Sequence, residues 1–194
     1  MKAGQWERLG GIIGRASLTA GLFFSGTLSA RMFLSVTVEP SVARIAAVKI
    51  REVRENKKQF LELLLLADEE EAMIDRYLGR GTMYVLEDDG VKSECVVTDE
   101  GNGVLEIKNI ATVPKHQGRG YARALIEHLT ETYRGRFSVL RVGTGESPAT
   151  LPFYERLGFV RTGRIKNFFI DHYAHPIVEA GVRLVDMIVL ERRL

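Results

Sequence analysis

Residues 113–122 read VPKHQGRGYA and join a strand-like apolar run to a helical pattern. Gly118 and Gly120 carry no Cβ, so the backbone can turn sharply here and approach a ligand closely. The first N–H groups of the following helix have no partners within the helix and lie at the positive end of its dipole. Such a helix start is suited to binding phosphate groups. The segment therefore predicts an anion site at a strand-to-helix turn, to which Lys115 and Arg119 add positive charge.

The common nucleotide-binding motifs do not occur in the chain. There is no Gly-x-x-x-x-Gly-Lys-Ser/Thr, so an ordinary P-loop is excluded. Residues 143–145 read GTG after a predicted strand, but Pro148 occupies the position of the third glycine of a dinucleotide fingerprint. From the residues alone, residues 113–122 form either an anion site or a plain glycine turn with solvated basic residues.

The patterns on both sides of this turn predict an α/β fold. Alternating apolar residues predict strands, and Asp88-Asp89-Gly90 is a strong hairpin signal between two of them. Helical spacing, with Asn56, Asp68 and Ser147 as candidate N-caps, predicts the helices. We expect a mixed sheet with helices on both faces. The predicted strands span 49–54, 83–87, 91–98, 104–113, 137–142, 159–170 and 184–190, and the predicted helices span 56–66, 69–78, 118–133 and 147–157.

The composition indicates an ordinary globular protein. The 194 residues suffice for one domain with a sizeable core, and 45% hydrophobic with 27% charged residues is typical of a soluble protein. The single cysteine, Cys95, excludes an internal disulfide and any site that needs several thiolates. Its place in an alternating run indicates a small buried hydrophobe. A net charge of +2 gives no argument for nucleic acid, and we expect no such partner.

The first 47 residues differ from the rest of the chain. Residues 1–47 carry five basic and two acidic residues, whereas the remainder carries 22 basic and 23 acidic residues. The apolar run 16–30 resembles the core of a signal peptide, but glycine and serine interrupt it and it is too short to span a membrane. We expect residues 1–47 to be a poorly ordered or non-essential extension, with a transit-like or membrane-surface segment as the alternative. The domain is expected over 48–194, in a cytoplasmic protein with no membrane partner.

A second motif follows the predicted anion site, because residues 153–159 read FYERLGF. The segment 117–122, QGRGYA, matches the Gln/Arg-x-x-Gly-x-Gly/Ala pattern of the GNAT superfamily, and residues 153–159 resemble a second signature of the same family. With both motifs in this order, residues 48–194 resemble the small bacterial GNAT N-acetyltransferases. The resemblance implies the GNAT fold, a mixed, mostly antiparallel sheet of about six to seven strands with helices on both faces.

The resemblance also implies acetyl-CoA as co-substrate, with no metal. In this family the segment after the central strand holds the pyrophosphate, and the splayed central strand, here residues 110–114, pairs with the pantetheine arm. A backbone N–H near residues 110–111 is expected to polarise the thioester carbonyl. Many members have Asn where this chain has Ser147, so the contact to the coenzyme differs there. The implied coenzyme-binding residues are Ile110, Ala111, Val113, Gln117, Gly118, Arg119, Gly120, Tyr121, Ala122, Ser147 and Tyr154.

Tyr154 is the candidate general acid. Acetylation of an amine releases the coenzyme as a thiolate, which should be protonated as the intermediate collapses. The second signature places a tyrosine beside the coenzyme sulfur, and this chain has Tyr154 there. The alternative is a tyrosine that only packs, with a buried ring and a wet hydroxyl.

Glu106 is the candidate general base. An alkyl ammonium with a pKa of about 10 has no lone pair, so the acceptor must lose a proton before it attacks. Glu106 lies eleven residues before Gln117, and the histone acetyltransferases of the superfamily have a general-base glutamate at a similar spacing. Strand alternation would place Glu106, Lys108 and Ile110 on one face. A solvated glutamate beside Lys108, with a water chain as the base, is the alternative.

The acceptor is not identified by any motif. His172 and His175 lack a third partner at metal-ligand spacing. Asp171, Glu179 and Asp186 could attract a cationic amine or could be ordinary loop residues. We expect acetyl transfer to a primary amine of a small molecule or a protein, by direct attack in a ternary complex. The alternatives are a non-catalytic acyl-CoA-binding or regulatory module on the same fold, and an interaction domain without coenzyme. Final strands that pair between subunits would give a homodimer.

Overall fold

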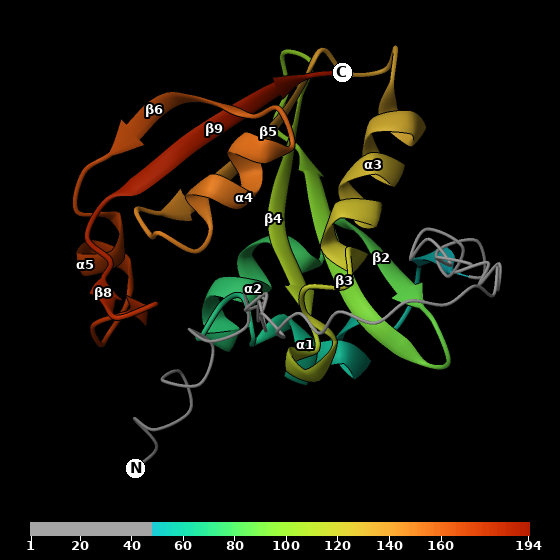
Figure 1. Ribbon diagram of the computed structural model, residues 1–194, viewed down its shortest axis with the longest axis horizontal. Helices are drawn as coiled ribbons and strands as arrows, with labels where there is room; N and C mark the ends of the chain where they lie inside the picture. Colours follow the sequence, from blue (N-terminus) through green and yellow to red (C-terminus); the bar gives the residue numbers. More distant parts are fainter. Residues whose placement is uncertain (1–47) are drawn as a thin grey trace, which may run out of the picture.

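A computed structural model of the protein describes residues 48–194, so the expectation for residues 1–47 lies outside the described residues. Within 48–194 the chain forms one seven-stranded sheet in the order β1-β2-β3-β4-β5-β9-β6 (Figure 1). β4 and β5 pair in parallel, and the other neighbouring strands pair antiparallel. The strands are β1 Lys49–Val53, β2 Thr82–Glu87, β3 Val91–Asp99, β4 Val104–Thr112, β5 Val139–Gly145, β6 Val160–Ile165 and β9 Met187–Arg193, with a small hairpin of β7 Val178–Glu179 and β8 Val182–Arg183.

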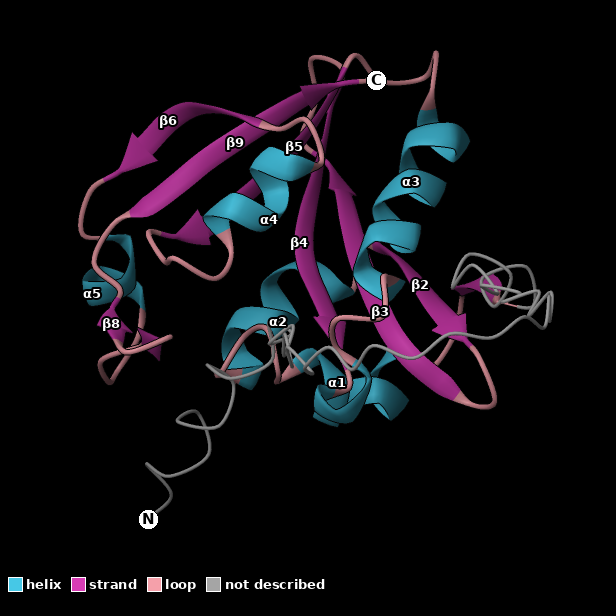
Figure 2. Cartoon of the chain, viewed as in Figure 1, coloured by secondary structure: helices cyan, strands magenta, loops and turns pink. Residues whose placement is uncertain are grey.

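Helices cover both faces of the sheet, as Figure 2 shows, so the predicted fold class is confirmed. They are α1 Leu61–Leu64, α2 Glu71–Leu78, α3 Tyr121–Tyr133, α4 Leu151–Arg156 and α5 Phe168–His172, with short 3₁₀ turns at Lys57–Phe60 and Pro114–His116. Leu125, Ile126 and Leu129 of α3 are fully buried in the larger core, to which Cys95 also belongs. The smaller core lies on the other face, where α1 and α2 pack. Cys95 is therefore the buried hydrophobe that the sequence predicts.

Several predicted boundaries and caps are wrong. The strand predicted over 159–170 ends at Ile165, because Asn167 adopts φ 55° and the chain turns into α5. The last strand lies three residues later than predicted, and α4 begins at Leu151. Asn56 is left-handed and makes no side-chain cap, and α2 begins at Glu71 without a cap from Asp68. The predicted hairpin at 88–90 is present, with the positive φ angles that a tight turn needs.

A bulge in β4 changes which side chains face which helices. Val96 pairs with Asn109 and Val97 pairs with Ile107, so Lys108 has no partner on β3. Such an extra residue shifts the alternation of side chains along the strand. Ile107 and Ile110 therefore both lie on the α3 side, whereas the Asn109 amide contacts α1 and α2 on the other side. Glu106 and Lys108 share a face as predicted, with their charged groups 2.7 Å apart, but the prediction that Ile110 lies on that face is wrong for this reason.

β4 and β5 separate just after their paired segment. The parallel register runs from Val104 with Val139 to Ile107 with Val142, although β4 continues to Thr112 and β5 to Gly145. Beyond Ile107 the main-chain groups of β4 that point toward β5 have no strand partner there. The two strands thus leave a V-shaped opening in the middle of the sheet, beside residues 110–113.

Candidate functional site

The turn between β4 and α3 has the geometry of an anion site. Gly118 has φ 73° and Gly120, the N-cap of α3, has φ 86°, a region that favours glycine. A Cβ added at either glycine would meet no heavy atom within 4 Å, so both face open space. No side chain caps α3, and its first N–H groups are therefore available to a ligand.

Neighbouring residues fix this turn and make it basic. The Tyr121 hydroxyl donates to Asp88 Oδ2 at 2.5 Å, and Gln117 Nε2 donates to the Thr112 carbonyl at 3.2 Å. The pKa of His116 is lowered, first by desolvation and then by the positive charges of nearby lysine and arginine side chains. These cations are Lys92, Lys115 and Arg119. The turn therefore presents free N–H groups and positive charge together, which fits a pyrophosphate.

Tyr154 lies in α4 on the same side of the sheet as α3. Its side chain is buried, with ring centroids 5.0 Å from Phe153 and 5.6 Å from Phe159. Its hydroxyl makes no hydrogen bond to any residue in 48–194. Burial raises the pKa of Tyr154, and Cys95 and Glu179 raise it further. The phenol is thus protonated at neutral pH and has a free O–H to donate.

Ser147 lies at the other side of the opening, in the turn between β5 and α4. It is 1% exposed, and its Oγ accepts a hydrogen bond from the Ala149 N–H at 3.1 Å. Glu179 of the β7–β8 hairpin also contacts the start of α4, where its carboxylate accepts a hydrogen bond from Thr150 Oγ1 at 3.4 Å. The hairpin is therefore held against the helix that carries Tyr154.

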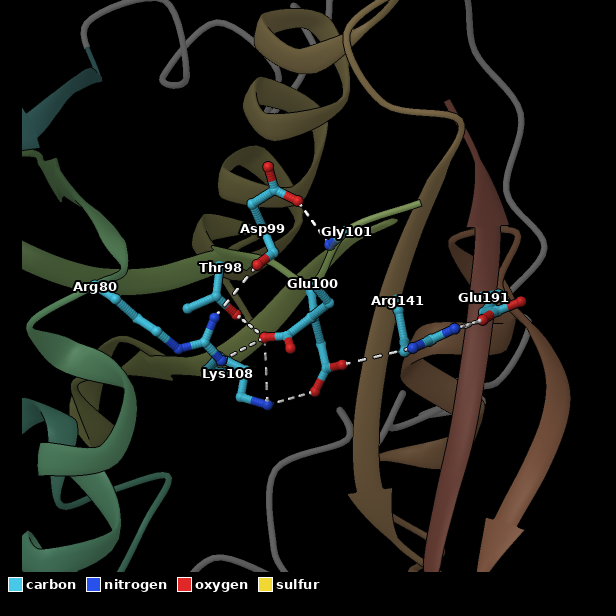
Figure 3. Close-up of polar contacts among 9 residues, drawn as sticks. Arg80, Thr98, Asp99, Glu100, Gly101, Lys108, Arg141 and Glu191 are labelled. Atoms are coloured by element: carbon cyan, nitrogen blue, oxygen red, sulfur yellow. Dashed lines mark hydrogen bonds and ion pairs between the residues drawn. The ribbon is translucent and has the colours of Figure 1, made fainter. Parts of the chain in front are cut away.

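Glu106 lies on the opposite face of the sheet, in an ionic network. Its carboxylate is 2.7 Å from Lys108 Nζ and 3.9 Å from Arg141 Nη1. Lys108 also pairs with Glu100, and Arg141 also pairs with Glu191, as Figure 3 shows. Glu106 also lines an open groove of about 440 Å³ across β5, β9 and β6. The structure thus places Glu106 beside the opening but does not bring it together with Tyr154.

The remaining polar candidates have other partners. Asp186 binds Arg164 at 2.8 Å and the Asn167 N–H at 2.9 Å. His175 Nε2 lies 2.8 Å from Glu69 Oε2. Residues 48–194 contain no group of three or more metal-ligating side chains placed to hold an ion. In the same range, no helix is both long and apolar enough to cross a bilayer.

Sequence reasoning missed a buried polar cluster on the α1 and α2 side of the sheet. Asn109 Nδ2 donates to Tyr77 Oη at 2.8 Å, and Tyr77 Oη contacts Asp68 Oδ2 at 3.4 Å. The Tyr173 hydroxyl donates to Asp68 Oδ1 at 3.2 Å from a segment 105 residues away. Glu94 of β3 is fully buried on this face. Polar residues at positions 94 and 109, inside apolar strands, were the available signal.

Comparison with known proteins identifies the family. Residues 79–161 match the model of the acetyltransferase (GNAT) domain. A Bacillus subtilis protein described as the uncharacterized N-acetyltransferase YvbK is 30% identical over 139 residues, which cover 70% of this chain and 90% of that protein. The chain therefore belongs to the GNAT acetyltransferase family.

Solved structures agree and show the coenzyme. A GNAT family acetyltransferase from Elizabethkingia anophelis with acetyl-CoA bound is 33% identical with a TM-score of 0.72, covering 76% of this chain and 98% of that one. A Bacillus subtilis acetyltransferase in complex with CoA is 29% identical with a TM-score of 0.70, covering 76% and 99%. An IAA acetyltransferase from Bacillus cereus is 35% identical with a TM-score of 0.71, covering 76% and 100%. Acetyl-CoA is the co-substrate of this chain, and the open, basic turn at the start of α3 fits its pyrophosphate.

Proposed function

We propose that the protein transfers the acetyl group of acetyl-CoA to a primary amine of a small molecule or a protein, by direct attack in a ternary complex. The observation that carries the proposal is the V-shaped opening between β4 and β5, with a free anion-binding turn at one end and the buried Tyr154 phenol on the same side. In the reaction a C–N bond forms and the C–S bond breaks. The products are an amide, the coenzyme thiol and a proton from the ammonium.

The β4–α3 segment would hold and orient the coenzyme. The N–H groups at the start of α3 bind the pyrophosphate, and Arg119 adds charge. The main chain at Ile110, Ala111 and Val113 then pairs with the pantetheine arm, because β5 leaves this part of β4 unpaired. A main-chain N–H near Ile110 or Ala111 polarises the carbonyl where negative charge develops.

Tyr154 would give its proton to the departing sulfur. Its raised pKa keeps the phenol protonated, and its hydroxyl has no competing hydrogen bond within residues 48–194. Such an acid contributes on the order of 10²–10⁴-fold to turnover.

Glu106 would take the proton of the ammonium. It lies at the end of the paired part of β4, one residue before Ile107, on the face opposite Tyr154. Its ion pairs with Lys108 and Arg141 would have to rearrange for the carboxylate to meet the amine. A water chain from the amine is the alternative route for this proton.

We also propose that two copies of the protein form a homodimer. β6 is one of the two edge strands of the described sheet, and all of its residues are exposed, with Val160 and Ile165 at 62% and 46%. An exposed edge strand offers main-chain groups for pairing with another chain. Analytical ultracentrifugation of the full chain tests this, and a monomer at all concentrations would contradict it.

The test of the proposed function is a panel of amines incubated with the protein and acetyl-CoA, with free thiol as the readout. Thiol release that depends on one class of primary amine supports it. Tight acetyl-CoA binding without thiol release for any amine would instead support a non-catalytic acyl-CoA-binding module.

A further inference from the structure

The polar cluster on the α1 and α2 face has more hydrogen-bond acceptors than donors. Asp68 contributes a carboxylate that is 9% exposed, and it receives the hydroxyl groups of Tyr77 and Tyr173. The Asn109 amide donates from Nδ2 to Tyr77 Oη and to the Leu64 carbonyl. These contacts use the donors of the cluster while leaving lone pairs free on its oxygens.

Two side chains of the cluster have buried oxygens without partners. Asn109 is 2% exposed, and its Oδ1 has no hydrogen-bond partner among the described residues. Glu94 is 0% exposed, and neither oxygen of its carboxyl group has one. Buried oxygens without donors are costly, so such a site favours a donor-rich ligand. No lysine or arginine in 48–194 forms an ion pair or hydrogen bond with Asp68, so this carboxylate has no cationic partner among the described residues.

The cluster lies next to the opening in the sheet, on the side away from α3. Asn109 directly follows the bulge residue Lys108, where β4 has parted from β5. Asp68 lies in the loop between α1 and α2, and Tyr173 lies in the segment after α5. Further bonds join these two segments, from the Ala174 N–H to Glu70 Oε1 at 3.0 Å and between His175 and Glu69 at 2.8 Å. Asp68 therefore lies where two distant parts of the chain meet beside the opening.

We propose that the primary ammonium of the acetyl acceptor binds to the Asp68 carboxylate, between the hydroxyl groups of Tyr77 and Tyr173. The inference rests on the proposed function and adds to it the residue that recognises the acceptor. An ammonium group has three N–H donors and no acceptor, which is what the cluster lacks. The acceptor reaches the opening from the α1 and α2 face, while acetyl-CoA occupies the α3 side.

The electrostatics of the cluster agree with a cationic ligand. Burial raises the pKa of Asp68, with a further contribution from Glu70, whereas the backbone and the two phenols lower it. A carboxylate in such a place is destabilised by desolvation, and a bound cation offsets that cost. Glu69 and Glu70 lie beside it and add attraction for a cation, and His175 is the titratable group that pairs with both.

The test uses Asp68→Asn in the full chain, with the best amine from the panel. We expect the KM for the amine to rise tenfold or more while the Kd for acetyl-CoA stays unchanged. Glu71→Gln is the matched control, since this exposed carboxylate lies in the same region and pairs with Lys58 at 2.8 Å. Its KM should equal that of the wild type. The ligand can be varied as well, by replacing the amine with an alcohol of the same shape. In the wild type, the inhibition constant of the alcohol should be at least tenfold higher than the KM of the amine, and in Asp68→Asn the two values should be similar.

A second variant covers the case in which Asp68→Asn does not fold. Tyr173→Phe keeps the ring and removes one hydroxyl, so the KM should rise about fivefold, the worth of one hydrogen bond. A wild type that acetylates no amine overturns the proposed function and this inference with it. A wild type that acetylates the amine, with unchanged KM in the folded variants, overturns this inference alone.

Discussion

Replacing Gly120 with alanine tests whether the start of α3 holds the coenzyme. Gly120 has φ 86° and an added Cβ would point into space where no heavy atom lies within 4 Å. The methyl group would therefore meet nothing in the protein, but it would occupy the place of a phosphate oxygen. Gly135 is the matched control, because it has φ 76° just beyond the other end of α3 and also has no heavy atom within 4 Å of an added Cβ.

The magnitudes separate the two glycines. A left-handed residue with a Cβ costs about 1–2 kcal/mol, so Gly120→Ala and Gly135→Ala should lose similar stability. For a domain of this size that loss corresponds to a fall in Tm of about 2–8 °C. Only Gly120→Ala should also bind acetyl-CoA tenfold or more weakly, a loss of about 1.4 kcal/mol or more.

The assay is calorimetric titration of acetyl-CoA into both variants, after a thermal melt confirms that each is folded. The expected result is a similar Tm in the two variants and a weaker Kd in Gly120→Ala alone. Equal acetyl-CoA affinity in both variants would refute the placement of the pyrophosphate at this turn.

The other predictions concern the active centre, the buried carboxyl group and the domain boundary. Tyr154→Phe should lower turnover on the order of 10²–10⁴-fold with unchanged acetyl-CoA affinity, and normal turnover would remove Tyr154 from the mechanism. Glu106→Gln should abolish the acidic limb of the pH–rate profile, and the control Glu191→Gln should retain it. If both variants retain the limb, Glu106 is not the base, and a water chain takes that role. Burial raises the pKa of Glu94 from 4.5 to about 8, so the stability from its bound proton is complete below pH 4.5 and is lost as the pH rises toward 8. Glu94→Gln should therefore flatten the fall in Tm between these pH values, and an unchanged slope would contradict the raised pKa. A chain that begins at Val48 should bind acetyl-CoA with the Kd of the full chain, and a weaker Kd would show that residues 1–47 contribute.

The parts of the fold that were predictable depend on local backbone geometry. The turn at Gly118 and Gly120 and the hairpin at Asp89 and Gly90 need positive φ angles, and glycine signals such positions in the sequence. The burial of Cys95 likewise follows from the alternation of one strand. In each case the residues that form the feature are neighbours in the chain.

The parts that were not predictable depend on contacts between distant segments. The bulge at Lys108 exists only relative to the register of β3, so strand alternation alone gave the wrong face for Ile110. Aspartate is a common helix cap, which is why Asp68 was predicted to cap a helix, but its carboxylate accepts hydrogen bonds from Tyr77 and Tyr173 instead. Tyr173 comes from the other end of the domain, and no local pattern could place it there.

The most direct measurement of the proposed function is the stoichiometry of transfer in a single reaction. The protein is mixed with acetyl-CoA and the amine that gives the fastest thiol release, and free thiol and acetylated amine are quantified together, the latter by mass spectrometry. We expect one thiol for each amide formed, and no covalently acetylated protein, since the amine attacks directly in a ternary complex. Two results would contradict that reaction. One is thiol release without formation of the amide, and the other is an acetylated protein that forms before the amide and as fast as the amide is produced.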